Sequence, residues 1–465
     1  MGYDWRDDRI AELERENAYL RARIVELEAR VRELEALLAR YSGNSSKPPS
    51  SDPPGAPPPA PPKRTGRKRG GQPGHKKHDR ELVPNERVTR TTVVKPTECR
   101  RCHGALSGND PEPERHQVTE VPKVVATVEE YQLHTLHCPT CGISTSATLP
   151  PGVPTGAFGP RLQALVAVCA GDYRIGKRGI ERLVEDFFDV PISLGSVSNL
   201  EQATSDAVAV PVEEVATAIR DQRVVHADET GWFQGGKRAW LWAAITGQMA
   251  VFLIRGTRGM KVAKELLGAA FAGILVSDRW PAYEWIEVKR RQLCWAHLIR
   301  QFREFQGLGP EADTIGRALE LLAETMFHGW HRVRDGTQTR AEFQQLIGPL
   351  REHVVANLQA GVACQVRGVS GRCDEILALE PALWTFAYVE GVEPTNNAGE
   401  HQIRHGVMWR KTSFGTDSPS GSLFVERILT VVATCRMQRR NVLDYVAAAC
   451  DAARLGQAPP SLLPC

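Results

Sequence analysis

Residues 223–278 follow an order of apolar and amphipathic segments that few folds accommodate. In chain order, the pattern predicts strands at residues 223–228, 238–246 and 249–254, a helix at residues 260–271 and a strand at residues 273–278. The first and last of these strands each end in an acid, Asp228 and Asp278. This order predicts an α/β ribonuclease-H-like core with carboxylates at neighbouring strand ends.

A third acid lies in the segment Glu393-Pro-Thr-Asn-Asn-Ala-Gly-Glu400. Thr395 can cap a helix here, because a threonine hydroxyl accepts a hydrogen bond from a free amide of the first turn. In that helix, a spacing of three and four residues places on one face Asn396, Asn397, Glu400 and Arg404. We therefore expect Glu400 to lie beside the two aspartates.

The three acids predict metal-dependent cleavage of phosphodiesters. Two divalent ions about 4 Å apart can activate a nucleophile and stabilise the departing oxygen, and Mg²⁺ prefers oxygen ligands. We expect Asp228, Asp278 and Glu400 to be catalytic and to bind two Mg²⁺ (or Mn²⁺) ions per active site. The chain has 55 acidic residues, so the triplet alone is weak, and a structural role for each acid stays open.

Residues 1–41 predict a leucine-zipper coiled coil. One core position of the heptad holds Ile10, Asn17, Ile24, Val31 and Leu38, and the other holds Leu13, Leu20, Leu27 and Leu34. This pattern favours two parallel strands, with Asn17 fixing the register. We expect a homodimer or a higher oligomer; an amphipathic helix packed on its own domain is the alternative.

Residues 42–80 predict a disordered Pro-rich and basic linker, because they cannot bury enough apolar surface to fold. Residues 63–80 hold eight Lys or Arg against one Asp, which favours an anionic partner such as DNA. The candidate DNA contacts are Arg64, Arg67, Lys68, Arg69, Lys76 and Lys77. A merely solvated linker is the alternative.

Residues 81–150 predict a zinc ribbon. Of the eleven cysteines, four form two CxxC pairs, namely Cys99, Cys102, Cys138 and Cys141. Four thiolates complete a tetrahedral site and leave no open position, which favours one structural Zn²⁺; chance or redox use is the alternative. Residues 88–94 and 124–136 show the alternation of strands.

The remaining ranges complete a multidomain prediction. Residues 155–222 predict a helical, helix-turn-helix-like domain, with helices at 161–170, 176–188 and 196–207. The ribonuclease-H-like core is expected in two parts, residues 223–305 and residues 391–455, and the second part contains the catalytic Glu. A helical insertion at residues 306–390 separates them. No apolar run approaches the length of a membrane span, so we expect a cytoplasmic, nucleoid-associated protein with no membrane partner.

Four motifs now carry a resemblance to a known family. They are His226-Ala-Asp-Glu-Thr-Gly-Trp232, Val276-Ser-Asp-Arg-Trp-Pro-Ala-Tyr283, Leu293-Cys-Trp-Ala-His-Leu-Ile-Arg300, and Glu393 to Glu400 with Trp409-Arg-Lys411. Together with the zipper, the linker and the paired CxxC, they resemble the insertion sequence 66 family of bacterial transposases. The sequence departs from that pattern at His401, where the family commonly has Arg, and at His405, where Pro is frequent.

The resemblance implies a DDE transposase, a metal-dependent polynucleotidyl transferase of a bacterial insertion sequence. Such an enzyme binds element ends and target DNA, hydrolyses the ends to free a 3′ hydroxyl and joins that hydroxyl to the target. By position, the family's acidic triad falls on Asp228, Asp278 and Glu400. The resemblance also implies small accessory proteins of the same element as partners.

Other residues are weaker candidates. His226, on the same strand face as Asp228, and His297 are candidates for accessory roles, with packing as the alternative. Glu229 points to the opposite face from Asp228 and makes the poorer ligand. The remaining candidates for DNA contact, whose alternative is a solvated basic face, are Asn396, Asn397, Arg404, Arg410 and Lys411.

Two other functions compete with this prediction. The first is a non-enzymatic DNA-binding protein, in which the zipper, arm and zinc ribbon act and the nuclease-like core is inactive. Both strand-end aspartates and the Asn-Asn-x-x-Glu segment are intact, which an inactive core need not retain. The second is a glycosidase with paired acids, for which a zinc ribbon and a basic arm would have no use.

Overall fold

A computed structural model describes residues 17, 20, 21, 23, 24, 27 and 80–464 of the chain. The predicted basic linker, apart from Arg80, and most of the predicted zipper lie outside these residues. The six described zipper positions are helical and exposed. The coiled coil and the linker therefore stay predictions.

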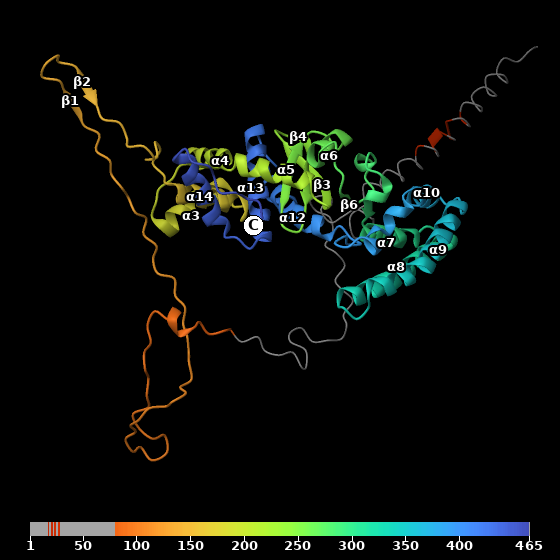
Figure 1. The fold of residues 1–465 in the computed structure, drawn as a ribbon, viewed down its shortest axis with the longest axis horizontal. Helices are drawn as coiled ribbons and strands as arrows, with labels where there is room; N and C mark the ends of the chain where they lie inside the picture. Colours follow the sequence, from red (N-terminus) through yellow and green to blue (C-terminus); the bar gives the residue numbers. More distant parts are fainter. Residues whose placement is uncertain (1–16, 18–19, 22, 25–26, 28–79, 465) are drawn as a thin grey trace, which may run out of the picture.

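Residues 80–150 contain little regular structure. A short 3₁₀ helix, η2 (Asn85–Arg87), is followed by a hairpin of β1 (Thr135–His137) and β2 (Ser144–Ser146), which stands apart from the helical body (Figure 1). The strand expected at residues 88–94 is absent, and of the strand expected at residues 124–136 only Thr135 and Leu136 lie in a strand, β1. Apart from the half-buried Val88, their valines, Val94 and Val128 among them, are exposed, so no packed partner stabilises a sheet here.

Four helices precede the sheet: α2 (Pro160–Gly171), α3 (Lys177–Phe188), α4 (Leu194–Ala207) and α5 (Ala209–Arg220). The first three match the expected helices to within two residues at each end. Pro160 stands at the start of α2, and the Ser193 hydroxyl caps α4 by accepting from the Ser196 amide. Both helices pack against α13 (Pro419–Met437) and α14 (Val442–Arg454).

A five-stranded mixed sheet forms the centre, in the order β5-β4-β3-β6-β7. Its elements are β3 (Val224–Gln234), β4 (Lys237–Ile245), β5 (Ala250–Arg255), α6 (Met260–Leu267), β6 (Ile274–Ser277) and β7 (Arg291–Leu293), with η3 (Pro281–Tyr283) and η4 (Val288–Arg290) between the last two strands. The predicted order of three strands, helix and strand is confirmed. The β3–β4–β5 pairs are antiparallel, whereas β3–β6 and β6–β7 are parallel. Strand β7 was not predicted.

One expectation about the sheet is wrong, because Asp228 does not end its strand. A two-residue turn, Gly235-Gly236, joins β3 to β4, and both glycines have positive φ, as the hairpin turns that suit twisted strands require. This hairpin extends β3 to Gln234, so Asp228 lies in its middle. The parallel partner β6 stops at Ser277, and Asp278 follows its end as expected.

The edge strand β5 is covered by side chains of α13. Oε1 of Glu426 accepts the Ile254 amide at 2.8 Å, and the Thr430 and Thr434 hydroxyls accept the amides of Phe252 and Ala250, each at 3.1 Å. Because these three residues recur every four positions, they lie along one face of α13. The helix thus satisfies amides that an edge strand would otherwise expose.

The segment that follows the sheet in the chain and precedes α12 (Asn397–Ser413) forms a second apolar core. It is built from α7 (Trp295–Phe305), α8 (Pro310–Arg334), α9 (Arg340–Ala363), α10 (Ser370–Ala378), η5 (Glu380–Leu383) and α11 (Thr385–Tyr388). Trp330 packs edge-on against Phe386 with ring centroids 5.0 Å apart. Helices α8, α9 and α10 form an arc at one end of the body (Figure 1). Among the described residues, no helix is both long and apolar enough to cross a bilayer.

Candidate active site

The register of β3 and β6 places two of the expected acids side by side. His226 pairs with Val276 in this parallel ladder, and continuing the register by two residues aligns Asp228 with Asp278. Successive side chains of a strand alternate between faces, so Asp228 shares a face with His226. The two acids meet because β6 ends where β3 continues.

Asn396 brings the third acid to this face. Its Nδ2 donates to the Ala227 carbonyl at 2.9 Å, and its Oδ1 lies 3.1 Å from His226 Nδ1. Asn396 is the residue before α12, and no side chain caps that helix, so the expected Thr395 cap is wrong. The amide that begins α12 is bonded to β3 itself, which sets Glu400, one turn later, beside Asp228.

The three acids interact electrostatically. The pKa of Asp228 is raised well above its ordinary value, first by burial and then by the charges of Glu229, Asp278 and Glu400. Its carboxylate accepts one hydrogen bond, from the Glu229 amide at 2.9 Å, and no ion pair reaches it from the described part of the chain. Burial also raises the pKa of Glu400. A cation here would relieve both effects.

Glu229 has a different environment, on the opposite face of β3. Its carboxylate accepts from the Tyr283 hydroxyl at 2.6 Å and from Arg258 Nε at 2.8 Å. Burial, with the charge of Asp278, raises the pKa of Glu229 to about 7. Because these partners already hold both of its oxygens, Glu229 is a poor metal ligand, as the alternation of the strand predicts.

Arg258 links this buried acid to the site. Its Nη2 lies 3.8 Å from Asp278 Oδ2, and its guanidinium lies 3.7 Å from the centroid of the Trp280 ring. The Trp280 amide also donates to Asp278 Oδ1 at 2.9 Å. No sequence pattern pointed to Arg258, because it precedes α6 in a loop far from the acidic motifs.

Helix α7 surrounds Glu400 with three side chains from the Leu293 to Arg300 motif. Relative to Glu400 Oε1, His297 Nδ1 lies at 3.5 Å, Arg300 Nη2 at 3.8 Å and Cys294 Sγ at 3.9 Å. Burial, with the nearby Arg300 charge, lowers the pKa of His297 to about 4. His297 is therefore neutral at pH 7. The other candidate histidine, His226, instead contacts Asn396. Cys294 and Arg300 were not predicted as site residues.

The expected DNA contacts divide into three groups. Asn396 is buried, and Arg410 Nη1 donates to the Gly231 carbonyl at 2.7 Å; these contacts hold α12 on β3, so the burial of Asn396 is incompatible with its expected DNA contact. Asn397, Arg404 and Lys411 are exposed on α12. The basic-arm candidates lie outside the described residues, namely Arg64, Arg67, Lys68, Arg69, Lys76 and Lys77.

The two CxxC pairs form similar turns that do not meet. The Cys99 amide donates to Gly104 O and the Cys138 amide to Ile143 O, at 2.8 and 2.9 Å. Backbone amides lower the pKa of Cys99 and of Cys138. Figure 1 shows the β1–β2 hairpin, which carries the second pair, away from the segment of the first. Across the described ranges, the four cysteines Cys99, Cys102, Cys138 and Cys141 form no group of three or more ligands.

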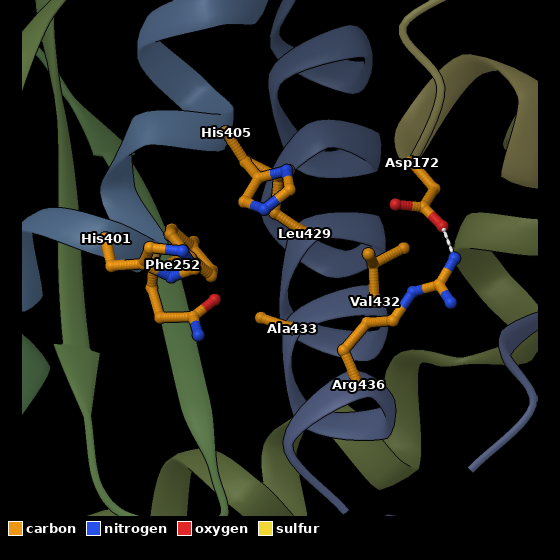
Figure 2. Close-up of a pocket in the computed structure, with 9 residues that line it drawn as sticks. Asp172, Phe252, His401, His405, Leu429, Val432, Ala433 and Arg436 are labelled. Atoms are coloured by element: carbon orange, nitrogen blue, oxygen red, sulfur yellow. Dashed lines mark hydrogen bonds and ion pairs between the residues drawn. The ribbon is translucent and has the colours of Figure 1, made fainter. Parts of the chain in front are cut away.

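A cavity of about 230 Å³ lies between α12, α13 and β5, and none of the three acids lines it. His401 and His405 face it from α12, with Asp172 and Arg436 paired on its far side (Figure 2). Burial lowers the pKa of His405. The two positions at which the sequence departs from the insertion sequence 66 pattern therefore line this separate cavity.

Comparisons with known proteins agree with the motifs. The model of a family described as "Transposase IS66 family" matches residues 155–422, a range that holds all three acids. A family of unknown function, DUF6444, matches residues 4–81. An uncharacterized protein from Sinorhizobium fredii, y4qI, is 26% identical over 235 residues, which cover 45% of this chain and 42% of that protein. The match thus spans less than half of that relative's length.

Proposed function

Because this chain belongs to the IS66 family of transposases, we propose that it binds the ends of a bacterial insertion sequence and catalyses phosphodiester hydrolysis and strand transfer. The observation that carries the proposal is that Asp228 on β3, Asp278 just after β6 and Glu400 on α12 lie close enough for their charges to interact, although their oxygens do not all lie within 4.8 Å of one another. These residues are remote in sequence, and their negative charges interact in the folded chain. Such a cluster is costly without a cation.

The donor set fits hard divalent ions. Carboxylate oxygens are the ligands that Mg²⁺ and Mn²⁺ prefer, and we propose that the three acids hold two such ions. When bound, these ions would supply an activated nucleophile and stabilise the departing oxygen. The sheet order β5-β4-β3-β6-β7 supports the same assignment, because a ribonuclease-H-like core has these two antiparallel and two parallel pairings.

The protein's own residues hold and orient the acids. Asn396 fixes α12 on β3, and Arg258 with the Trp280 amide orients Asp278. Because His297 is neutral, it can donate or accept a hydrogen bond beside Glu400 without adding a charge. Exposed Arg404 and Lys411 follow Glu400 along α12, and we propose that they contact the DNA backbone.

The amino-terminal half is proposed to bind and assemble. The zipper at residues 1–41 would pair two chains, the basic residues of 42–80 would follow DNA phosphates, and residues 81–150 would form a zinc ribbon. Accessory proteins of the same element are proposed as further partners. A DNA-binding protein with an inactive core is less well supported, because the charge cluster of the site is complete.

The direct test uses a labelled duplex carrying the terminal repeat of the element that encodes the chain. We expect Mg²⁺ or Mn²⁺ to promote cleavage that leaves a 3′ hydroxyl, and EDTA to stop it. Joining of this hydroxyl to a second duplex tests strand transfer. Binding of the duplex without cleavage, under all metal conditions, would support the non-enzymatic alternative instead.

A further inference from the structure

A thiol, an imidazole and a carboxylate meet on the α7 side of Glu400. Cys294, His297 and Glu400 each offer one ligand atom, and these atoms lie within 4.8 Å of one another. Within residues 80–464 and the few described before them, this is the one group of three or more such ligands. Its composition differs from the acidic cluster, because sulfur and nitrogen are soft or borderline ligands that Mg²⁺ avoids.

Two of the three separations between these atoms are close to those of a tetrahedral metal site, and the third, from sulfur to nitrogen, is within 4.8 Å. Around a zinc ion, bond lengths of 2.0–2.3 Å put neighbouring nitrogen and oxygen ligands about 3.4 Å apart and sulfur and oxygen ligands about 3.6 Å apart. The observed separations are 3.5 Å from His297 Nδ1 to Glu400 Oε1 and 3.9 Å from Cys294 Sγ to the same oxygen. An ion therefore needs only small shifts of the side chains.

Two further observations point to a ligand at this place. His297 Nδ1 is buried and has no hydrogen-bond partner in the structure, although buried ring nitrogens normally find one. The Cys294 sulfur accepts the Asn396 amide at 3.2 Å and stands at the N-cap of α7. Both a donated amide and a helix N-terminus stabilise a thiolate, and here they oppose the burial that raises the pKa of the Cys294 thiol to about 11.

We propose that Cys294, His297 and Glu400 bind a single ion of the Zn²⁺ class, with the fourth position open to water or to a DNA phosphate. On binding, the Cys294 thiol releases its proton to solvent and the sulfur–metal bond replaces the sulfur–hydrogen bond. No electron transfer is involved. The carboxylate of Glu400 is only partly buried, with 32% of its side chain exposed, so it offers the route by which the ion enters.

The effect of this mixed site on DNA cleavage rests on the proposed function. Glu400 would belong both to the oxygen cluster with Asp228 and Asp278 and to this mixed site. An ion of the Zn²⁺ class that takes Glu400 Oε1 withdraws that oxygen from the oxygen cluster, so such an ion inhibits the Mg²⁺-dependent reaction. Arg300 opposes binding, because its guanidinium already lies 3.8 Å from the same oxygen and repels a cation.

Cobalt absorption spectroscopy on the full chain tests the site without any assay of DNA cleavage. Co²⁺ is a spectroscopic substitute for Zn²⁺, and a sulfur–cobalt bond gives a near-ultraviolet charge-transfer band. The four CxxC cysteines are replaced by serine in every sample, so that they do not contribute. We expect a band that appears at one equivalent of Co²⁺, is lost on addition of Zn²⁺ and is absent in Cys294→Ser.

Matched variants keep the result interpretable. Cys373→Ser removes another buried cysteine and should leave the band unchanged, while His297→Ala should weaken Co²⁺ binding by about tenfold or more. Arg300→Gln should tighten it. Circular dichroism checks that each variant is folded, and His297→Ala replaces Cys294→Ser as the deciding variant if the latter unfolds. A band that survives the deciding variant, or no band at all, overturns the proposal.

Cleavage adds a separate readout. With Mg²⁺ present, micromolar Zn²⁺ should inhibit the parent protein more strongly than Cys294→Ala, each measured against its own uninhibited rate. If neither the parent protein nor any variant cleaves DNA under any condition, while the cobalt band behaves as described, the proposed function fails and the mixed site stands. Equal inhibition of both proteins, with cleavage intact, overturns the regulatory consequence.

Discussion

Asn396 Oδ1 lies 3.1 Å from His226 Nδ1, and this contact joins the start of α12 to the strand that carries Asp228. The same side chain donates to the Ala227 carbonyl. Both residues are buried, so the pair is shielded from water. The position of Glu400 relative to the two aspartates therefore depends on a side-chain amide four residues before it.

Removing this amide should displace Glu400. Asn396→Ala leaves a buried carbonyl and the His226 ring without partners, which costs about 1–3 kcal/mol of stability. We expect DNA cleavage to fall by a larger factor than the remaining folded fraction explains. Urea denaturation and single-turnover cleavage measure the two effects. Asn397→Ala, at the exposed neighbour, is the control, and equal effects of both substitutions would contradict the role of Asn396.

The contact of Glu426 with β5 predicts a pH dependence. Burial raises the pKa of Glu426 above its ordinary value of 4.5, although Arg255 opposes the shift. The folded chain then binds more protons than the unfolded chain above pH 4.5, so this residue's contribution to stability falls as the pH rises. Glu426→Gln keeps the oxygen that accepts the Ile254 amide and removes the titration.

We therefore expect the free energy of unfolding to decline less between pH 5 and pH 7 in Glu426→Gln than in the parent protein, as measured by urea denaturation. Glu426→Ala removes the acceptor and should lose about 1–3 kcal/mol at both values of pH. A parallel pH dependence in the parent and Glu426→Gln would show that the carboxylate does not titrate in this range.

The paired CxxC turns predict bound zinc. After dialysis the full chain should retain one equivalent of Zn²⁺, and the double substitution Cys99→Ser with Cys138→Ser should lose it. Metal analysis by atomic emission measures the stoichiometry. Cys364→Ser with Cys450→Ser, in the helical body, is the matched control. Retention of zinc in the first double variant would refute the ribbon.

The heptads of residues 1–41 predict self-association. Multi-angle light scattering of the full chain should give a dimer or a larger species, and deletion of residues 1–41 should reduce its mass. Asn17→Leu should keep association but relax its register and stoichiometry. A monomer at micromolar concentration before any deletion would exclude the zipper.

Local sequence patterns predicted the order of the central strands and three helices well, because hydrophobic periodicity is set by which face each element buries. They misplaced the end of β3, which lies at Gln234, six residues beyond Asp228, where the Gly235-Gly236 turn joins it to β4. They also missed β7, which has only three residues and carries too short a pattern. Strand signals at residues 88–94 failed because a periodic segment forms a sheet only with a partner.

The sequence motifs selected three acids whose charges interact in the folded chain, but they did not predict most of the residues that contact these acids. Each of the three acids, Asp228, Asp278 and Glu400, lies within a recognisable sequence motif. Arg258, Tyr283 and Arg300 act through contacts between segments remote in sequence, which no local pattern contains. Asn396 was correctly placed at the start of the helix but was wrongly expected to contact DNA. A polar residue near a helix start has the same local sequence pattern whether its side chain faces solvent or a neighbouring strand.

Metal-dependent cleavage by charge-neutral variants tests the central claim most directly. Asp228→Asn, Asp278→Asn and Glu400→Gln keep side-chain size and remove one metal ligand each, and Glu352→Gln, at an exposed position of α9, is the control. With Mn²⁺ and a labelled element end, each of the three should lower the single-turnover cleavage rate by about a thousandfold or more while retaining DNA binding, and the control should match the parent. Cleavage at the parent rate by all three would contradict the assignment of these acids.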